Sequence, residues 1–225
     1  MKSASRQLTD SQRRQVNEAV ASAEARTSAE IVPVVATASG RYDRPEDLVG
    51  LWLGLASLAV VWAIVPDPPD VPGAWGGTPA LAKLAAMIGA CLVGFIVGAA
   101  VASRVGWLRR LFTPRGQMSD EVRTRAREIF FDHRVHHTSG ATGLCVYISL
   151  FERMAVLVAD EAVMAQLGQE ALDELRDRLI ADLRAGDVTD ALCACLRAAG
   201  EKLEAVLPRA GGDVNELPDA LVTID

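Results

Sequence analysis

The chain has 225 residues, enough for one ordinary domain with an appendage or for two small domains. Half of the residues are hydrophobic, and the formal net charge is -6 with acidic and basic residues interspersed, which argues against a general nucleic-acid-binding protein. The cysteines form no recognisable disulfide framework and are typical of structural thiols in a reducing compartment; they are Cys91, Cys145, Cys193 and Cys195.

The first segment predicts a helix followed by a strand. Thr9 and Gln12 have the spacing of a capping box, and apolar residues recur at helical spacing over 16–23, so we expect a helix that runs to about residue 26. Residues 29–37, AEIVPVVAT, are rich in β-branched residues and predict a short strand. Because Pro33 has no backbone donor, this strand should lie at a sheet edge or contain a local irregularity.

Two uncharged apolar runs then predict a membrane hairpin at 48–103, with helices at about 48–65 and 80–102. The runs are LVGLWLGLASLAVVWAIV and AAMIGACLVGFIVGAAVA, and each would span about 27 Å as a helix, close to the roughly 30 Å of a bilayer's hydrocarbon core. The polar start, MKSASRQLTDSQRRQ, is unlike a signal peptide, so no cleavage is expected. The lipid bilayer is therefore an expected partner.

Basic residues flank the hairpin on one side only. The loop between the two runs, PDPPDVPGAWGGTP, has no lysine or arginine and carries two aspartates, whereas a basic juxtamembrane segment follows at 104–117. By the positive-inside rule, we expect a multi-pass protein of the bacterial inner (plasma) membrane with both termini in the cytoplasm. The residues concerned are Arg41, Arg44, Asp67, Asp70, Arg104, Arg109, Arg110 and Arg115.

Small residues form ridges on both apolar runs. They recur at four-residue intervals, which allows helix backbones to approach closely. The ridges fit close packing within the hairpin, homo-oligomerisation through the membrane helices, or simply the ordinary abundance of small residues in such helices. They comprise Gly50 and Gly54 in the first run, and Ala86, Ala90, Gly94, Gly98 and Ala102 in the second.

The part after the hairpin, 118–208, predicts a helix, two strands and two helices. Ser119 is placed to cap the first helix, and residues 142–150 and 154–160 are apolar runs joined closely enough to form a β-hairpin, with Glu152 and Arg153 solvated in its turn. Leucines at helical spacing over 172–183 and 192–203 mark the last two helices. Asp187 should cap the final helix and Pro208 should end it.

Neither soluble part offers enough elements for a layered core by itself, so residues 1–47 and 118–208 should fold together. The expected fold class is α/β, with a small sheet of about three to four strands covered by helices. The membrane hairpin is inserted after the first strand, and the tail at 209–225 is extended.

Four strings resemble the TPM-domain family, in particular its bacterial members that contain a membrane hairpin: LTDSQRRQVNEAVASAEARTSAEIVPVV, TGLCVYISLFERMAVLVAD, RAGDVTDAL and DVNELPDALV. The resemblance implies an α/β sandwich. It also implies acid phosphatase activity, as in some members, divalent-cation binding, as in some, or a role in assembly or repair of membrane complexes, as in others. The chain departs from the family pattern at Thr142-Gly143 and at Asp160-Glu161-Ala162. These departures weigh against phosphatase activity.

Two groups of residues are candidates for a site. Asp160 and Glu161 follow a strand, where two carboxylates could hold Ca²⁺ or Mg²⁺, or could serve only as the cap and first-turn acid of the next helix. His133, His136 and His137 would share a face if their helix continued. They fit a metal site, a pH-sensitive or phosphate-contacting patch, or a polar helix end, and the last is preferred.

No nucleophile elbow, phosphate-binding glycine loop or paired-cysteine site appears in the sequence. We therefore expect an assembly or interaction module with a membrane-protein partner. The alternative is a phosphatase in which Asp160 and Glu161 hold a divalent cation and a histidine donates a proton.

Overall fold

The computed structural model describes residues 3–42, 44–66, 79–105, 110–211 and 214–225. The chain divides into two compact units. The first, here called the α/β unit, comprises Met1–Gly40 and Arg115–Asp225, and the second, called the hairpin unit, comprises Arg41–Pro114. The two soluble parts of the sequence thus fold together, as expected. The predicted loop acids Asp67 and Asp70, and Arg109, lie outside the described residues.

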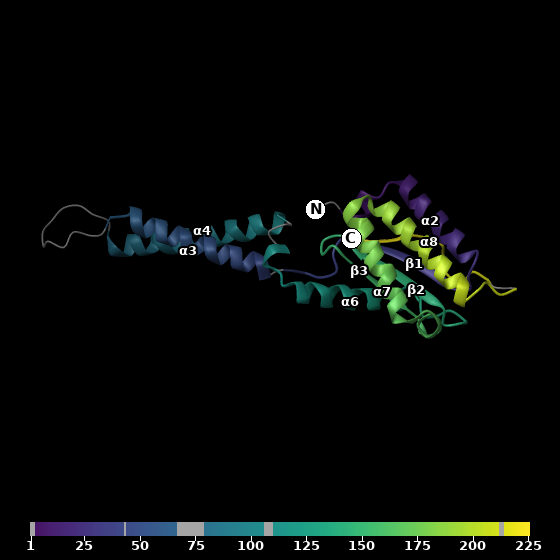
Figure 1. The fold of residues 1–225 in the computed structure, drawn as a ribbon. Helices are drawn as coiled ribbons and strands as arrows, with labels where there is room; N and C mark the ends of the chain where they lie inside the picture. The colour runs from purple at the N-terminus through teal and green to yellow at the C-terminus, as the bar shows by residue number, and fades with distance from the viewer. Residues whose placement is uncertain (1–2, 43, 67–78, 106–109, 212–213) are drawn as a thin grey trace, which may run out of the picture. The chain divides into compact units, whose positions relative to one another are not determined.

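The α/β unit is built on a four-stranded sheet in the order β3-β2-β1-β4 (Figure 1). Its strands are β1 (Glu30–Ala36), β2 (Gly143–Ser149), β3 (Met154–Ala159) and β4 (Val222–Ile224). β1 is parallel to both of its neighbours, whereas β2 and β3 form an antiparallel hairpin. This confirms the predicted small sheet and its hairpin, and the extended tail supplies the fourth strand.

Pro33 lies in an interior strand, so a simple edge position was the wrong expectation. β4 pairs only with Val34–Ala36, however, and the start of β1 has no strand on that side. The N–H of Glu30 points toward β2 and that of Ile31 points the other way, to the carboxylate of Glu24. By the alternation of a strand, the nitrogen of Pro33 faces the side that β4 leaves unpaired, so no ladder donor is lost.

Helices cover both faces of the sheet (Figure 1). They are α1 (Ala4–Gln7), α2 (Asp10–Glu24), α6 (Arg115–Asp132), α7 (Glu161–Ala185) and α8 (Val188–Val206). Alternate residues of β2 divide the core: Leu144, Val146 and Ile148 pack in one apolar cluster with α2, α7 and α8, whereas Cys145 and Tyr147 pack in another with α6.

Local signals fix several helix ends. Thr9 and Gln12 form the predicted capping box of α2, and the side chain of Asp187 accepts a hydrogen bond from the N–H of Thr189 at 2.7 Å, as expected of a cap. The predicted cap at Ser119 was wrong. α6 begins at Arg115, directly after Pro114, so Ser119 lies in its second turn.

A kink divides α7 at Gly168, whose φ of 79° and ψ of 163° are not helical. A side chain would be strained at this positive φ, and glycine is not. The kink separates a short first part, beginning after the cap residue Asp160, from a longer second part that packs on the sheet through Leu172, Leu175 and Leu179.

The hairpin unit contains α3 (Arg44–Ile64) and α4 (Ala80–Arg104), which pack closely at Gly50, Gly54, Gly94 and Gly98. A Cβ atom added at Gly98 would lie 2.8 Å from the Cα of Gly50, and one at Gly94 would lie 2.8 Å from the carbonyl oxygen of Leu53. At least part of the small-residue ridge therefore serves contact within the hairpin.

Candidate functional site

Asp160 stands where a strand meets a helix. Its Oδ1 accepts a hydrogen bond from the N–H of Glu161 at 2.8 Å, so it caps α7, and Glu161 is an exposed acid in the first turn. The other oxygen of Asp160, Oδ2, is buried and has no hydrogen-bond partner among the described residues. Within that part of the chain, no group of three or more metal-ligating side chains comes together. The contacts observed for the two acids are those of a helix cap and an exposed first-turn charge.

The histidines follow the end of α6 and do not continue it. α6 ends at Asp132, and the turn that follows contains Arg134 with a φ of 55°. His133, His136 and His137 are exposed, and the ring of His136 lies against that of Phe131 with centroids 4.9 Å apart. The single helical face that a metal site would need is not formed, and the placement is that of a polar helix end.

The carboxyl ends of β1 and β2 are where ligands often bind in parallel sheets, but here their polar groups bond to one another. Glu152, expected in solvent, is only 4% exposed. Its carboxylate accepts hydrogen bonds from the hydroxyl of Ser149 and from the N–H of Ser39, and the hydroxyl of Ser39 pairs with that of Tyr147. Burial raises the pKa of Tyr147 to about 12. The polar groups at this end of the sheet form a hydrogen-bonded cluster.

Residues from both ends of the chain meet beside the carboxyl end of β1. The carboxylate of Asp225 accepts hydrogen bonds from the N–H of Ser5 at 3.0 Å and from the hydroxyl of Thr37 at 3.2 Å. The hydrogen bonds from Ser5 lower the pKa of Asp225. These contacts hold the N-terminal segment and β4 together beside β1.

A groove runs along β3, at the edge of the sheet opposite β4. It has a volume of about 660 Å³ and is walled by α6 on one side and by α7 on the other. β3 is the edge strand here, and all six of its residues, MAVLVA, line the groove. None of the site residues expected from the sequence lines this groove.

The backbone of β3 presents hydrogen-bonding groups to the groove. The N–H of Asp160 points to β2, and the antiparallel register then turns Val158, Val156 and Met154 toward β2 as well. The N–H and C=O groups of Ala155, Leu157 and Ala159 consequently face away from the sheet. Within the described ranges of the chain, no hydrogen bond ends on these outward groups.

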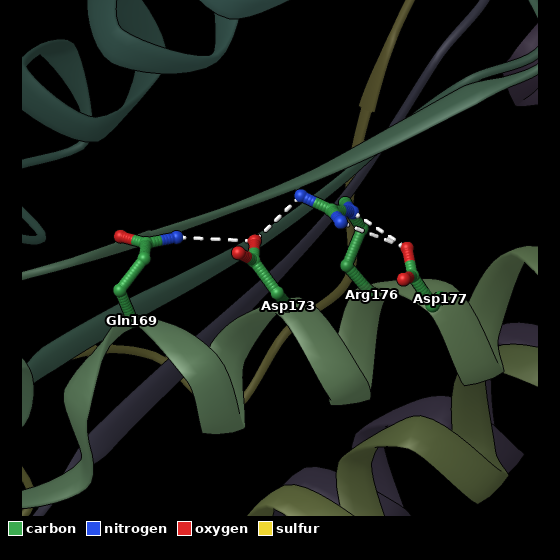
Figure 2. A network of polar contacts seen from close by, with 4 residues as sticks. All are labelled: Gln169, Asp173, Arg176 and Asp177. Carbon is green, nitrogen blue, oxygen red and sulfur yellow. Dashed lines mark hydrogen bonds and ion pairs between the residues drawn. The ribbon is translucent and has the colours of Figure 1, made fainter.

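Arginines line both walls of the groove. Arg123 and Arg127 stand one turn apart on α6, exposed, and neither has an ion pair within the described residues. On α7, Arg176 is held by Asp173 at 2.6 Å and by Asp177 at 2.8 Å, while Asp173 also accepts a hydrogen bond from Gln169 (Figure 2). Because Asp173 and Asp177 both pair with Arg176, the excess positive charge of the groove lies on the α6 wall, at Arg123 and Arg127.

Two sequence signals point to this site once the fold is known. The strand MAVLVA contains no charge or proline, which are the residues that usually protect an exposed sheet edge from pairing. Arg123 and Arg127 have the i, i+4 spacing of one helix face. Only the strand order makes β3 the edge, and that order depends on contacts distant in sequence.

A separate acidic cluster lies beside the start of β1. The carboxylate of Glu24 accepts a hydrogen bond from the N–H of Ile31 at 2.7 Å, while Glu30 accepts one from the N–H of Glu216 at 3.0 Å. Burial, with the nearby charges of Glu30 and Asp219, raises the pKa of Glu24 to about 9. A protonated Glu24 lets these carboxyl groups lie close together without a bound cation.

No family model and no curated protein matches the sequence. Among solved structures, the chain is similar to the NMR structure of the BA42 protein from the psychrophilic bacterium Bizionia argentinensis. The two share 14% sequence identity with a TM-score of 0.55, over 96% of this chain and 94% of that one. At this identity, the likeness shows a shared α/β fold and nothing about activity.

Proposed function

We propose that this protein is a membrane-anchored TPM-like domain that acts as an assembly or interaction module for a membrane complex. The observation that carries the proposal is the surface of the hairpin unit. The two helices bury Gly50, Gly54, Gly94 and Gly98 against each other and expose their large apolar residues, and only 11% of the most apolar window of each helix is buried. Trp52, Trp62 and Leu81, for example, are 67%, 63% and 80% exposed.

Such a surface favours a lipid environment. Contiguous exposed apolar patches on soluble monomers rarely exceed about 300–600 Å², and two helices of 21 and 25 residues with apolar outer faces offer a larger one. The lengths of both helices suit a bilayer. The basic residues that flank them support an orientation with both termini in the cytoplasm of a bacterial inner membrane.

The α/β unit supports a binding role better than a catalytic one. Its polar groups at the strand ends are bonded to one another, and its histidines lie in an exposed turn. An open feature among the described residues is the arginine-lined groove along β3.

The anchoring is tested by producing the full chain in bacteria and washing the membranes with alkaline carbonate. We expect the protein to stay in the membrane pellet and to be released by detergent. The matched control replaces residues 41–114 with a flexible Gly/Ser linker and should be found in the soluble fraction, because the contacts that define the α/β unit are internal. A full chain released by carbonate alone would refute the anchoring.

The orientation of the chain in the membrane is tested separately, with alkaline phosphatase fusions. Alkaline phosphatase, which is active only outside the cytoplasm, is fused after Asp225 or inserted between α3 and α4. The proposal requires an inactive terminal fusion and an active insertion. The reverse pattern would place both termini outside.

A divalent-cation-assisted phosphatase is the second candidate, favoured by one observation: the buried Oδ2 of Asp160, beside Glu161, has no partner among the described residues. This function predicts that millimolar Ca²⁺ or Mg²⁺ raises the melting temperature through binding to the folded state. The rise should be absent in the double variant Asp160→Asn, Glu161→Gln. An unchanged melting temperature in the wild type would reject the cation site and, with it, this candidate.

A further inference from the structure

We propose that the groove along β3 binds an extended, acidic peptide segment of a partner protein, which adds to the sheet as a fifth strand. This inference rests on the proposed interaction function and specifies the class of partner and the way it is recognised. It is carried by the outward backbone groups of β3, by the two helical walls and by Arg123 and Arg127 of α6, which have no ion pair among the described residues.

The backbone of β3 is prepared to pair with another strand. Ala155, Leu157 and Ala159 each direct an N–H and a C=O away from β2, and the three are spaced two residues apart, about 6.8 Å per step. An incoming strand presents its own donors and acceptors with the same period. Main-chain hydrogen bonds of this kind are the common feature of peptide recognition by strand addition.

The helices determine where the side chains of such a strand would lie. Successive side chains of a strand point to opposite faces of the sheet. One set would face α6, with Arg123 and Arg127, and the other would face α7, with Gln169 and Arg176. Ala155 is buried and the other side chains of β3 are half-buried, so the strand supplies an apolar surface between the walls, and alternating apolar and acidic residues would suit the groove.

The charges of the walls select an acidic segment. Arg123 and Arg127 are separated by about 6 Å along the axis of α6 and have no acid paired with them in the described chain. This spacing is close to that of alternate side chains on one face of a strand. Arg176 is held in the groove by Asp173 and Asp177 (Figure 2), which fixes its direction before a ligand arrives.

The same charges disfavour a second copy of this chain as the occupant. Antiparallel pairing of β3 with β3 would continue the sheet across a two-fold axis and would bring α6 of each copy onto the same face. Arg123 and Arg127 would then meet their own counterparts, and like charges brought together are destabilising. A partner strand of opposite charge has no such conflict.

The experiment uses the full chain in detergent micelles at about 150 mM salt, so that weak, long-range attraction is screened. The probe is a fluorescein-labelled peptide of four Val-Glu repeats, and binding is measured by fluorescence anisotropy. We expect saturable binding that is at least about tenfold tighter than that of a peptide of four Val-Lys repeats. Equal binding of the two peptides would overturn the inference.

Strand addition is separated from simple charge attraction by N-methylation of the probe. Methylation of alternate amides on one edge of the Val-Glu peptide should reduce affinity at least about tenfold, because that edge can no longer bond to β3. In the unmodified complex, hydrogen exchange should slow at the amides of Ala155, Leu157 and Ala159. Strand addition would be refuted if methylation of either edge of the peptide left its affinity unchanged and hydrogen exchange at the three amides did not slow. Binding would then be simple charge attraction to the surface.

The arginines are tested with a matched pair of variants. Arg123→Gln with Arg127→Gln should weaken the Val-Glu probe about tenfold, whereas Arg125→Gln, on the same helix but outside the groove lining, should leave it unchanged. Equal effects of both changes would refute the assignment. Failure of the groove and failure of the membrane proposal are distinguishable, because probe binding does not depend on the carbonate wash.

Discussion

The carboxylate of Glu152 accepts a hydrogen bond from the backbone N–H of Ser39 at 2.8 Å, across 113 residues of sequence. It also accepts one from the hydroxyl of Ser149. The first bond joins the turn between β2 and β3 to the chain just beyond β1. It therefore connects the two parts of the α/β unit that the hairpin unit separates in sequence.

Replacing Glu152 with alanine should destabilise the α/β unit by about 2–4 kcal/mol. The change leaves the N–H of Ser39 and the hydroxyl of Ser149 in a buried site without this acceptor, and unsatisfied buried donors are costly. Glu152→Gln keeps one acceptor and should cost less. The measurement is thermal melting in detergent, with Glu128→Ala, a change at an exposed ion pair, as the control. Equal melting temperatures for Glu152→Ala and Glu128→Ala would contradict the expectation.

The kink at Gly168 predicts that substitution by alanine affects stability differently at Gly168 and at Gly116. Gly168→Ala should lower stability by about 1–3 kcal/mol, because a Cβ atom has open space there but the φ of 79° is strained for any residue with a side chain. Gly116→Ala, in the first turn of α6 and equally uncrowded, should be neutral or slightly stabilising. Thermal melting compares them directly. A neutral Gly168→Ala would mean that α7 is not bent at this position.

Elements with a local cause were predictable from the sequence. The capping box at Thr9 and Gln12, the cap at Asp187 and the β2–β3 hairpin depend on neighbouring residues, and each is present in the structure. The α/β class with a small sheet followed from the order of these elements. Their boundaries were accurate to within a few residues.

Features that depend on distant contacts were missed. Glu152 was expected in solvent because glutamate in a turn usually is, and only the return of the chain at Ser39 buries it. Pro33 was expected at a sheet edge or at a local irregularity, whereas it lies in an interior strand whose pairing with β4 begins only at Val34. The groove along β3 could not be foreseen without the strand order, since Arg123 and Arg176 are brought to it by different helices.

The raised pKa of Glu24 predicts a pH-dependent stability. Burial is the main cause and raises this pKa to about 9, against 4.5 for an ordinary glutamate. Between these values, the folded chain holds a proton that the unfolded chain releases. The contribution of this group to stability is therefore greatest below about pH 4.5 and declines as pH rises toward 9.

The check is thermal melting of the wild type and Glu24→Gln between pH 5.5 and 9. The variant keeps a neutral side chain at every pH, so the difference between the two proteins should grow in its favour as pH rises. Glu161→Gln, at an exposed acid, is the control and should leave the profile unchanged. Parallel profiles for wild type and Glu24→Gln would show that Glu24 is ionised in the folded chain.

The close packing of α3 against α4 can be tested by substitution of Gly98, with Gly89 on the same helix as the control. A side chain at Gly98 would have its Cβ atom 2.8 Å from the Cα of Gly50 and 2.9 Å from the carbonyl oxygen of Val49, so α3 and α4 must separate to admit it. We expect Gly98→Val to destabilise the hairpin by about 1–3 kcal/mol. Gly89→Val, also on α4, meets nothing within 4 Å and should have a much smaller effect.

Denaturation of the detergent-solubilised protein with increasing SDS, followed by tryptophan emission, measures the difference, because Trp52 and Trp62 lie on α3. Gly98→Val should unfold at a lower SDS fraction than Gly89→Val. If the two variants unfold together and near the wild type, then the close approach of Gly98 to Gly50 does not stabilise the hairpin, and the small-residue ridge would have to serve contacts between copies of the chain.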